Sequence, residues 1–387
     1  MTKAKGVAIL GSTGSIGQTT LEVISAFPDQ FRVVALTANK NADLLQEQAE
    51  RFRPGLTVLA DDSVDTQGSS IRIGWDAVLE AAAYPDAEIV VNGLVGAAGL
   101  EPTLLALEAG KRVALANKES LVVGGPLVMS ALAEFGGELI PVDSEHSAVF
   151  QCLAGSAVEA VRGIVLTASG GPFRDWNPSE LRDVTPADAL RHPTWTMGAK
   201  ITVDSATLVN KALEVIEAHF LFGLPYDRIS IVVHPQSIVH SLVEYRDGSI
   251  LAQLGHPTMS VPVLYALTYP ERLPFDPPKL DLAEVGSLKF EPLEPGKYPA
   301  FELGREAAEC GGTTTAVFNA ANEEAVAAFL NDRLPFTAIA DVIGKVLAEH
   351  ANDAVTSLDV VNRADAWARA RARDCLNDIA TNSKRLA

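Results

Sequence analysis

The sequence predicts an α/β protein built from an N-terminal Rossmann-type parallel sheet, an α+β catalytic and connective domain, and a C-terminal helical bundle. Three observations lead to this class. Apolar runs alternate with amphipathic stretches up to residue 143, a strong hairpin signal follows, and two apolar helical faces occur near the C-terminus. A length of 387 residues allows two or three domains at about 150 residues each, and 48% hydrophobic residues supplies their cores.

The N-terminal part, residues 1–143, contains short runs of Val, Ile and Leu that predict strands. Continuous apolar strands separated by helices are typical of a parallel sheet that is covered on both faces. The predicted strands occupy residues 6–10, 31–38, 88–94, 112–116 and 138–142.

The middle part, residues 144–275, follows a different pattern. We expect a strand at 163–168, a loop rich in Pro and Trp at 170–200, and a helix from about Ala206 to Phe222. Apolar runs at 237–245 and 249–254 flank Asp247-Gly248, and Asp-Gly between apolar runs is a strong hairpin signal. The middle domain is therefore expected to be α+β with antiparallel pairing.

Prolines then mark an extended connector, which we place at residues 276–300 because Pro prevents long helices. The final part, residues 301–387, has two helical apolar faces and is expected to form a small bundle that supports the middle domain. The prolines that mark the connector occur over residues 270–299 and are Pro270, Pro274, Pro277, Pro278, Pro292, Pro295 and Pro299. The first helical face comprises Phe318, Ala321, Ala325 and Phe329, and the second comprises Ile339, Val342, Ile343, Val346 and Leu347.

The net charge is −18, from 31 basic and 49 acidic residues. Nucleic acids and anionic membranes carry the same sign, so neither is an expected partner. The three cysteines, Cys152, Cys310 and Cys375, are far apart, which gives no sign of a disulfide framework or a metal knuckle. No apolar run approaches the length of a membrane span, and a strand begins too early for a signal peptide. We expect a cytoplasmic protein.

A glycine-rich loop, Gly11-Ser-Thr-Gly14-Ser-Ile-Gly17, lies between the first predicted strand and a helix. Its glycines permit a tight turn and a close approach of backbone N–H groups to a pyrophosphate, and the helix N-terminus adds partial positive charge. A glycine-rich turn without a ligand is the alternative. Where an NAD-binding fold would place a carboxylate, this chain has Thr37-Ala38-Asn39-Lys40-Asn41, which favours the 2′-phosphate of NADP. Lys40 as an ordinary solvated lysine is the competing interpretation.

Carboxylates follow the strand at 138–142, in the segment Asp143-Ser144-Glu145-His146. If this segment is extended, Asp143 and Glu145 point the same way and can share one cation. Carboxylates without a cysteine partner suit Mg²⁺ or Mn²⁺ better than Zn²⁺. The alternative is that the pair caps a helix.

A third ligand is sought in the helix after residue 205, where Asn210, Lys211 and Glu214 share one sector. Glu217 is the rival ligand, and a surface ion pair between Lys211 and Glu214 is the non-functional alternative.

Two further segments suit a small phosphorylated substrate. Ser169-Gly170-Gly171 offers a hydroxyl and backbone N–H groups to a phosphate. The segment at 191–198 combines Pro193 and Gly198 with Trp195 and Met197, which is typical of a loop that closes over a substrate and excludes water. Burial of Trp195 in the core is the alternative.

Taken together, the ordered motifs resemble the 1-deoxy-D-xylulose 5-phosphate reductoisomerase family. They are GSTGSIG at 11–17, NKES at 117–120, VDSEHSA at 142–148, SGGPF at 169–173, HPTWTMG at 192–198, VDSATLVNKALE at 203–214 and HPQSIVHS at 234–241. The resemblance implies a metal-dependent, NADPH-linked isomerisation and reduction of 1-deoxy-D-xylulose 5-phosphate to 2-C-methyl-D-erythritol 4-phosphate, in isoprenoid precursor synthesis. The carbon skeleton would rearrange either by retro-aldol and aldol steps or by an α-ketol shift. It also implies a homodimer.

The resemblance assigns roles to individual positions. Asp143, Glu145 and Glu214 match metal ligands, and Lys118 matches a lysine close to metal and substrate. The matching substrate positions are Lys118, Ser144, Glu145, Ser169, His192, Trp195, Met197, Ser205, Asn210, Lys211 and Glu214. The matching cofactor positions are Thr13, Gly14, Ser15, Ile16, Asn39, Lys40, Asn41, Asn117, Glu119 and Gly198. Small departures occur at Thr194, Thr196 and Ala212, and none removes a ligand.

Two other function classes compete with this one. A simple NADP-dependent dehydrogenase would share the glycine loop, but the semialdehyde type needs a thiol nucleophile, and no cysteine has a suitable context. A homoserine-type enzyme would not need three carboxylates around a divalent ion. A non-catalytic nucleotide-sensing protein would have lost acidic ligands or the loop, and both are intact.

Overall fold

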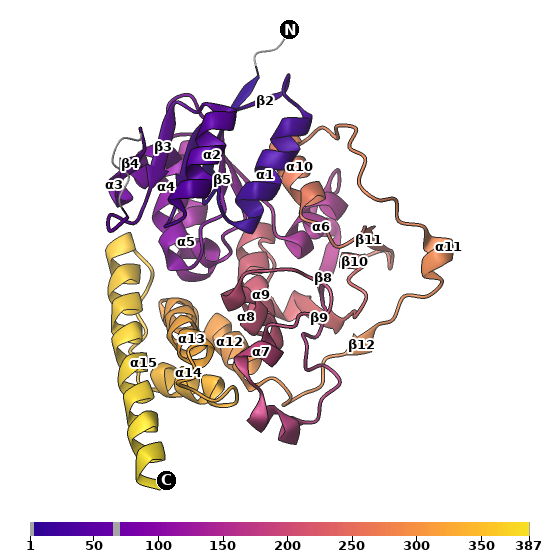
Figure 1. The fold of residues 1–387 in the computed structure, drawn as a ribbon. Coiled ribbons are helices and arrows are strands. Elements are labelled where there is room, and N and C mark those ends of the chain that lie inside the picture. The colour runs from indigo at the N-terminus through magenta and orange to yellow at the C-terminus, as the bar shows by residue number, and fades with distance from the viewer. Residues whose placement is uncertain (1–3, 65–69, 387) are drawn as a thin grey trace. The chain divides into compact units, whose positions relative to one another are not determined.

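The computed structural model describes residues 4–64 and 70–386. They form two compact units (Figure 1). The first comprises the described residues of Met1–Ser120, Leu127–Ser147 and Thr258–Lys279, and the second comprises those of Leu121–Pro126, Ala148–Pro257 and Leu280–Ala387. These limits are not those of the four segments expected from the sequence, and three crossings of the chain between the units fall inside helices.

The first unit contains a seven-stranded sheet in the order β4-β3-β2-β1-β5-β6-β7, with every pair parallel. The Rossmann-type sheet is therefore confirmed. The sequence missed β3 and β4, since both are short and the two residues of β4 are exposed. The strands are β1 (Lys5–Leu10), β2 (Phe31–Ala38), β3 (Leu56–Leu59), β4 (Arg72–Ile73), β5 (Ile89–Asn92), β6 (Arg112–Leu115) and β7 (Glu138–Pro141).

Helices connect most of these strands, as is usual in a parallel sheet. They are α1 (Ser15–Ala26), α2 (Ala42–Phe52), α3 (Trp75–Ala82), η1 (Ala97–Gly99), α4 (Leu100–Glu108) and α5 (Glu119–Phe135). Helix α5 is kinked at Gly124, whose φ of −135° is not helical, two residues before Pro126. Proline inside a helix removes a backbone hydrogen bond and clashes with the preceding turn, which accounts for the kink.

Residues 258–279 belong to the first unit although they follow the hairpin of the second. Their helix α10 (Ser260–Thr268) contacts α1, and the Arg112 guanidinium donates to the carbonyl of Leu267 at 3.3 Å. The ring of Phe275 lies 6.4 Å from that of Phe27. Helix α10 is buried along most of its length, so its sequence gives no polar face from which its packing partner could be inferred.

The second unit contains a five-stranded mixed sheet in the order β11-β10-β8-β9-β12. The strands are β8 (Val161–Ala168), β9 (Ile229–Val233), β10 (Val239–Tyr245), β11 (Ile250–Leu254) and β12 (Glu291–Pro292). The predicted hairpin is confirmed as β10 and β11, with Gly248 at a φ of 88°. The expected antiparallel pairing holds except between β8 and β9, which are parallel.

The loop predicted at 170–200 contains short helices, and the Pro-rich connector contains both α11 and β12, so neither is wholly extended. The helix expected from about Ala206 to Phe222 is confirmed as α9 (Val209–Phe222), which begins later because Leu208 lies in the left-handed region at a φ of 56°. The sequence did not predict the preceding helix α8 (Ala199–Ala206). The helices are α6 (Ser144–Leu153), η2 (Val158–Ala160), η3 (Pro178–Asp183), α7 (Pro186–Ala189), α8 (Ala199–Ala206), α9 (Val209–Phe222), η4 (Tyr226–Arg228) and α11 (Leu282–Val285).

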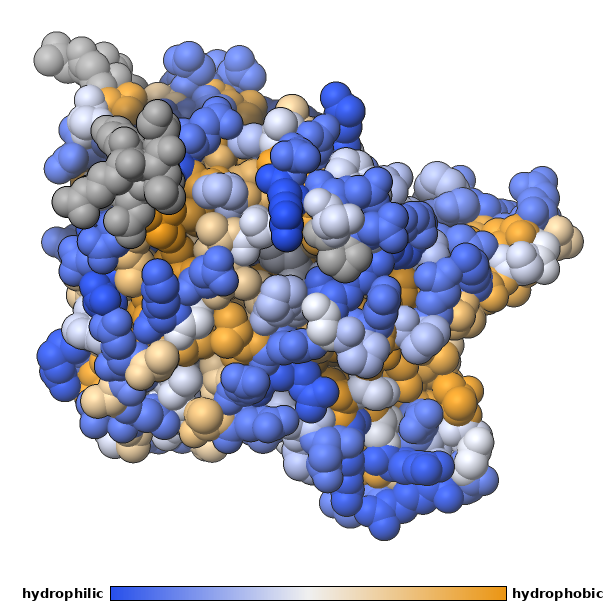
Figure 2. All heavy atoms as spheres, turned by 90° about the horizontal axis from the view of Figure 1, so that it is seen from below, coloured by the Kyte–Doolittle hydropathy of each residue, from blue (hydrophilic) through white to orange (hydrophobic). Residues whose placement is uncertain are grey.

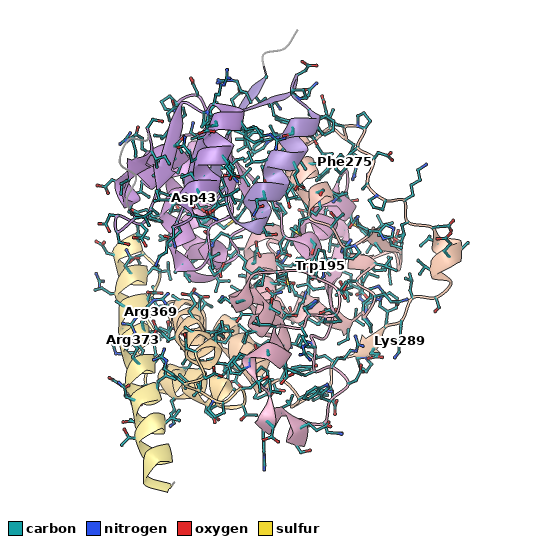
Figure 3. The ribbon with its side chains drawn as sticks, in the orientation of Figure 1. Asp43, Trp195, Phe275, Lys289, Arg369 and Arg373 are labelled. Atoms are coloured by element: carbon teal, nitrogen blue, oxygen red, sulfur yellow. The ribbon has the colours of Figure 1, made fainter. Side chains whose placement is uncertain are left out.

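The C-terminal helices are α12 (Pro299–Cys310), α13 (Thr314–Leu330), α14 (Ala338–Ala348) and α15 (Leu358–Leu386). The expected apolar faces are confirmed: all four residues of the α13 face are buried, and so are those of α14 except the half-buried Leu347. Arg369 and Arg373 project from α15 (Figure 3) and pair with Glu323 and Glu324 of α13.

The surface mixes residue types: hydrophilic and hydrophobic residues are interspersed on the face drawn in Figure 2. Within residues 4–64 and 70–386, no helix has both the length and the apolar character that crossing a membrane requires.

Candidate active site

The glycine-rich loop lies between β1 and α1, the context that a phosphate-binding loop requires. Gly11 has a φ of 81°, and a Cβ there would lie 2.8 Å from the carbonyl oxygen of Gly93. A Cβ on Gly17 would lie 2.4 Å from the carbonyl oxygen of Gly11. Helix α1 has no acidic residue in its first turn, and Gly14 and Ser15 at its start are exposed. This helix N-terminus therefore presents backbone N–H groups to an anion.

The loop after β2 presents a cation where NAD-binding folds present a carboxylate. Asn39 and Lys40 are exposed, and Asn41 caps α2 by accepting a hydrogen bond from the N–H of Leu44 at 3.2 Å. The Lys40 ammonium lies 3.3 Å from Asp61, but its side chain is 73% exposed. Such an exposed pair is weak, so Lys40 can turn to a phosphate group at little cost.

Asn117 connects two loops at the carboxyl edge of the first sheet. Its amide donates to the carbonyl oxygens of Leu94 and Gly96, both at 2.9 Å, and also to Glu119 at 3.2 Å. Its side-chain oxygen accepts from the N–H and hydroxyl of Ser120. These bonds fix the start of α5, and with it the position of Lys118.

Lys118 and Asp143 form a buried ion pair in the first unit. Their charged atoms are 2.7 Å apart, and the side chains are only 7% and 10% exposed. The extended geometry expected for Asp143 and Glu145 is wrong, because α6 begins at Ser144 and the N–H of Glu145 donates to the Asp143 carboxylate at 3.3 Å. Asp143 therefore occupies the capping position, and Glu145 lies in the first turn, where the hydroxyl of Ser144 donates to it.

Helix α9 of the second unit holds a buried polar cluster. The side chains of Asn210 and Lys211 donate to different oxygens of Glu214. Lys211 is 3% exposed and Glu214 is 1% exposed, so the surface ion pair considered above is wrong. Glu217, one turn further on, is also buried. Burying a carboxylate is costly unless hydrogen bonds and an opposite charge compensate, which is why these side chains are found together.

The loop before α8 is organised around His192. Its Nδ1 accepts hydrogen bonds from the backbone N–H groups of Thr194 and Trp195, at 3.2 and 2.9 Å. The proton of a neutral ring is therefore on Nε2, which lies 3.0 Å from the hydroxyl oxygen of Ser169. Gly171 donates its N–H to the same oxygen at 3.2 Å. With two donors on its oxygen, the Ser169 hydroxyl keeps its own proton for another acceptor.

Burial lowers the pKa of His192. The side chain of Trp195, which Figure 3 labels, is half-buried rather than in the core. Its ring lies 6.4 Å from that of His240. Met197 is also half-buried, and Gly198 is exposed at the N-terminus of α8. A partly exposed indole in a short loop is consistent with a closing segment, and it excludes the core alternative for Trp195.

Sequence inspection missed three buried polar residues. Gln48 of α2 bonds to Ser12 of the glycine loop, and Asn322 of α13 donates to the buried carboxylate of Asp204 at 2.8 Å. Asp204 also pairs with Lys200 at 2.9 Å and directly precedes Ser205, which is 7% exposed. The partners are 36 and 118 residues apart, so no local pattern could reveal them.

Three family models match the chain. The model of 1-deoxy-D-xylulose 5-phosphate reductoisomerase matches residues 7–125, and that of its C-terminal domain matches residues 139–222. A model described as the DXP reductoisomerase C-terminal domain matches residues 254–371.

Curated relatives and solved structures agree with the family models. The 1-deoxy-D-xylulose 5-phosphate reductoisomerase of Nostoc punctiforme is 49% identical, covering 98% of each chain, and that of a Synechococcus strain is 52% identical, covering 94% of this chain and 96% of its own. The Zymomonas mobilis enzyme in complex with NADPH has a TM-score of 0.90 at 43% identity, covering 96% of this chain and 99% of its own. A reductoisomerase in complex with NADPH, fosmidomycin and magnesium has a TM-score of 0.89 at 38% identity, covering 96% and 98%. The chain belongs to the 1-deoxy-D-xylulose 5-phosphate reductoisomerase family.

Proposed function

We propose that this chain converts 1-deoxy-D-xylulose 5-phosphate to 2-C-methyl-D-erythritol 4-phosphate, by skeletal rearrangement and hydride transfer from NADPH, with the help of a divalent metal ion. The observation that carries the proposal is the set of buried or half-buried carboxylates at the family's motif positions, each accompanied by a nitrogen or hydroxyl donor. A simple hydride-transfer enzyme does not need such carboxylates. The solved relatives bound to NADPH and magnesium support it further.

The cofactor would bind along the carboxyl edge of the parallel sheet. Its pyrophosphate would lie on the N-terminus of α1, where Gly14 and Ser15 are exposed, and its 2′-phosphate would pair with Lys40. The absence of a carboxylate between Thr37 and Asn41 supports NADPH over NADH. The residues we assign to it are Thr13, Gly14, Ser15, Ile16, Asn39, Lys40, Asn41, Asn117, Glu119 and Gly198.

We assign Asp143, Glu145 and Glu214 as the metal ligands. All are oxygen donors, which suits Mg²⁺ or Mn²⁺. Each carboxylate oxygen has two lone pairs, so the bonds to Lys118, Asn210 and Lys211 leave room for a cation. When bound, the ion would supply Lewis-acid stabilisation of negative charge on the substrate's carbonyl and hydroxyl oxygens.

The chain's own donors would hold the sugar phosphate. Ser205, Asn210 and Lys211 are assigned to the phosphate group, and Ser144, Ser169 and His192 to hydroxyl or phosphate oxygens. Lys118 is assigned to a substrate oxygen near the metal, where its ammonium can hold the oxygen or assist proton transfer. Trp195 and Met197 would cover the substrate and the nicotinamide, which excludes water from the reacting carbon.

We propose these roles for the parts of the chain: residues 1–143 bind NADPH, 144–275 carry catalysis and dimerisation, 276–300 connect, and 301–387 support. A homodimer is supported by the edge strand β11, whose Ile250 and Leu251 are 55% and 48% exposed, because apolar edge strands tend to be covered. Light scattering during size-exclusion chromatography would measure the mass. A cytoplasmic location is supported by Cys152, Cys310 and Cys375, none of which forms a disulfide among the described residues.

The metal assignment is tested by comparing Glu214→Gln with Glu217→Gln, because both carboxylates are buried on the same helix. The first variant should lose about 10²-fold or more of its turnover and bind Mn²⁺ more weakly, while its NADPH affinity stays unchanged. The second variant should keep its Mn²⁺ affinity. Full activity of Glu214→Gln, with loss in Glu217→Gln, would move the ligand to Glu217. Activity that persists after chelation would favour a simple dehydrogenase.

A further inference from the structure

We propose that Gln48 is a positioning residue for NADPH, because it fixes the orientation of the Ser12–Thr13 peptide in the glycine-rich loop. The inference rests on the proposed cofactor. Two hydrogen bonds carry it: the hydroxyl of Ser12 donates to Gln48 Oε1 at 2.7 Å, and Gln48 Nε2 donates to the carbonyl oxygen of Ser12 at 3.0 Å. Ser12 is completely buried and Gln48 is 6% exposed.

The chemistry of the pair allows only one arrangement of the glutamine amide. A backbone carbonyl oxygen can only accept, so the amide nitrogen of Gln48 must face it. The amide oxygen then faces the Ser12 hydroxyl, which can donate. The N–H of Ser12 donates to the carbonyl of Thr37 at 2.7 Å. The hydroxyl, the carbonyl and the N–H of Ser12 therefore all form hydrogen bonds. Only a side chain with both a donor and an acceptor can make the two bonds that Gln48 makes.

This arrangement determines where the next N–H points. In a trans peptide the C=O and the following N–H point in opposite directions. Because the Ser12 carbonyl faces Gln48, the N–H of Thr13 faces away from it. Among the described residues, none accepts a hydrogen bond from this N–H. It is therefore available to a phosphate oxygen, beside the exposed Gly14 and Ser15.

Gln48 also links the two ends of the proposed cofactor site. It lies on α2, the helix that Asn41 caps and that Lys40 precedes. The same helix thus carries the candidate 2′-phosphate loop at its start and holds the pyrophosphate loop through Gln48. A cofactor that touches both loops requires them at a fixed separation, and two buried hydrogen bonds supply that constraint.

The test measures NADPH dissociation constants by nicotinamide fluorescence, without sugar phosphate. Gln48→Met removes both bonds at similar volume and should raise the constant about tenfold. Gln48→Glu keeps an acceptor for the Ser12 hydroxyl, but its ionised carboxylate has no proton to donate to the carbonyl. At a pH where this side chain is ionised, the variant should weaken binding at least as much. Ser12→Ala keeps the carbonyl bond and should weaken binding by a smaller factor. Gln46→Met is the matched control, since Gln46 bonds only to the exposed Glu50 on the same helix, and its binding should not change.

A positioning role makes a further demand, namely that the KM for the sugar phosphate stays unchanged in Gln48→Met when NADPH is saturating. The inference is overturned if Gln48→Met binds NADPH as tightly as the unaltered chain, or if Ser12→Ala weakens binding as much as Gln48→Met. If Gln48→Met does not fold, Gln48→Glu takes its place. The inference then requires Gln48→Glu to weaken NADPH binding more than Ser12→Ala does, and equal weakening overturns it. Failure of the unaltered chain to bind NADPH would instead refute the proposed function.

Discussion

His192 has an unusually well-defined protonation state for a loop residue. Two backbone N–H groups point at its Nδ1, so the neutral ring carries its proton on Nε2. A second proton would have to enter on Nδ1, where it would face both donors. Burial alone already lowers the pKa of His192 from the ordinary value of 6.5. The ring is thus expected to stay neutral through the physiological range.

The prediction for His192 is tested by NMR of the protein labelled with ¹⁵N-histidine, with His192→Gln used to assign its signals. We expect the Nε2–H tautomer and a pKa below 6.5. Because the folded pKa is lowered, the unfolded chain binds the proton first as the pH falls below 6.5, so this residue disfavours the folded loop at acid pH and has no effect well above it. An Nδ1–H tautomer, or a pKa at or above 6.5, would contradict the geometry.

Lys118 has a role in stability as well as in the proposed chemistry. Its removal would take away the ammonium that lies 2.7 Å from the carboxylate of Asp143, which is only 10% exposed. Breaking a buried pair in this way costs about 3–5 kcal/mol. We therefore expect Lys118→Met to lower the free energy of unfolding by about 3 kcal/mol, measured in urea.

The double variant Lys118→Met with Asp143→Asn isolates the cause. It also removes the negative charge of Asp143 and should recover part of the lost stability. If the double variant is as unstable as the sum of the single variants, the cost of Lys118→Met does not come from the buried charge.

At the scale of secondary-structure elements, α8 is held to α13 by a polar bond. The amide of Asn322 reaches the carboxylate of Asp204, which is 1% exposed and precedes Ser205. Helix α13 is otherwise rich in small apolar residues, so this bond sets the position of α8 along it. The C-terminal helices thereby influence the residue we assign to the substrate phosphate, although they carry none of the assigned ligands.

Asn322→Ala should therefore raise the KM for the sugar phosphate several-fold and lower the free energy of unfolding by about 2 kcal/mol, because a charged hydrogen bond is lost. Asn319→Ala is the matched control. Asn319 is equally buried, one turn earlier on α13, and donates to Glu323 at 3.0 Å. It should lose comparable stability without any change in KM. Equal KM values for both variants would show that Asn322 acts only through stability.

The sequence predicted elements well where the signal was local. The parallel strands, the Asp247-Gly248 hairpin and the apolar faces of α13 and α14 all depend on nearby residues. The break between α8 and α9 was missed because Leu208 is a good helix former, and nothing local indicates its positive φ. The capping position of Asp143 was only an alternative in the sequence analysis. An acidic residue that follows a strand can continue the extended segment or cap a helix, and the sequence is the same in both cases.

The residues of the candidate site also differ in whether the sequence could indicate them. Glu214 was a candidate because it shares one sector of a helix with Asn210 and Lys211, whereas Lys118 and His192 received their roles from the resemblance of their motifs to the family. Their supports could not be named from the sequence, since Gln48 and Asn322 bond to residues 36 and 118 positions away. A single sequence contains no record of which distant polar groups meet.

At the scale of the whole molecule, a chain with a net charge of −18 is proposed to bind two anions, NADPH and a sugar phosphate. Positive charges placed locally allow an acidic protein to bind these anions. Lys40, Lys118 and Lys211 all lie in the motifs assigned to these ligands, and the last two are buried beside carboxylates. A divalent ion would add further positive charge. The net charge thus describes the outer surface, and the ligands are met by a few placed cations and backbone N–H groups.

The central claim is that the chain joins an isomerisation to a reduction. The most direct measurement supplies 1-deoxy-D-xylulose 5-phosphate, NADPH and Mg²⁺ to the purified protein, follows nicotinamide oxidation, and identifies the product by NMR. We predict 2-C-methyl-D-erythritol 4-phosphate, formed in equal amount to the NADPH consumed and abolished by chelation. A linear reduced sugar phosphate, with its carbon skeleton unchanged, would contradict the account.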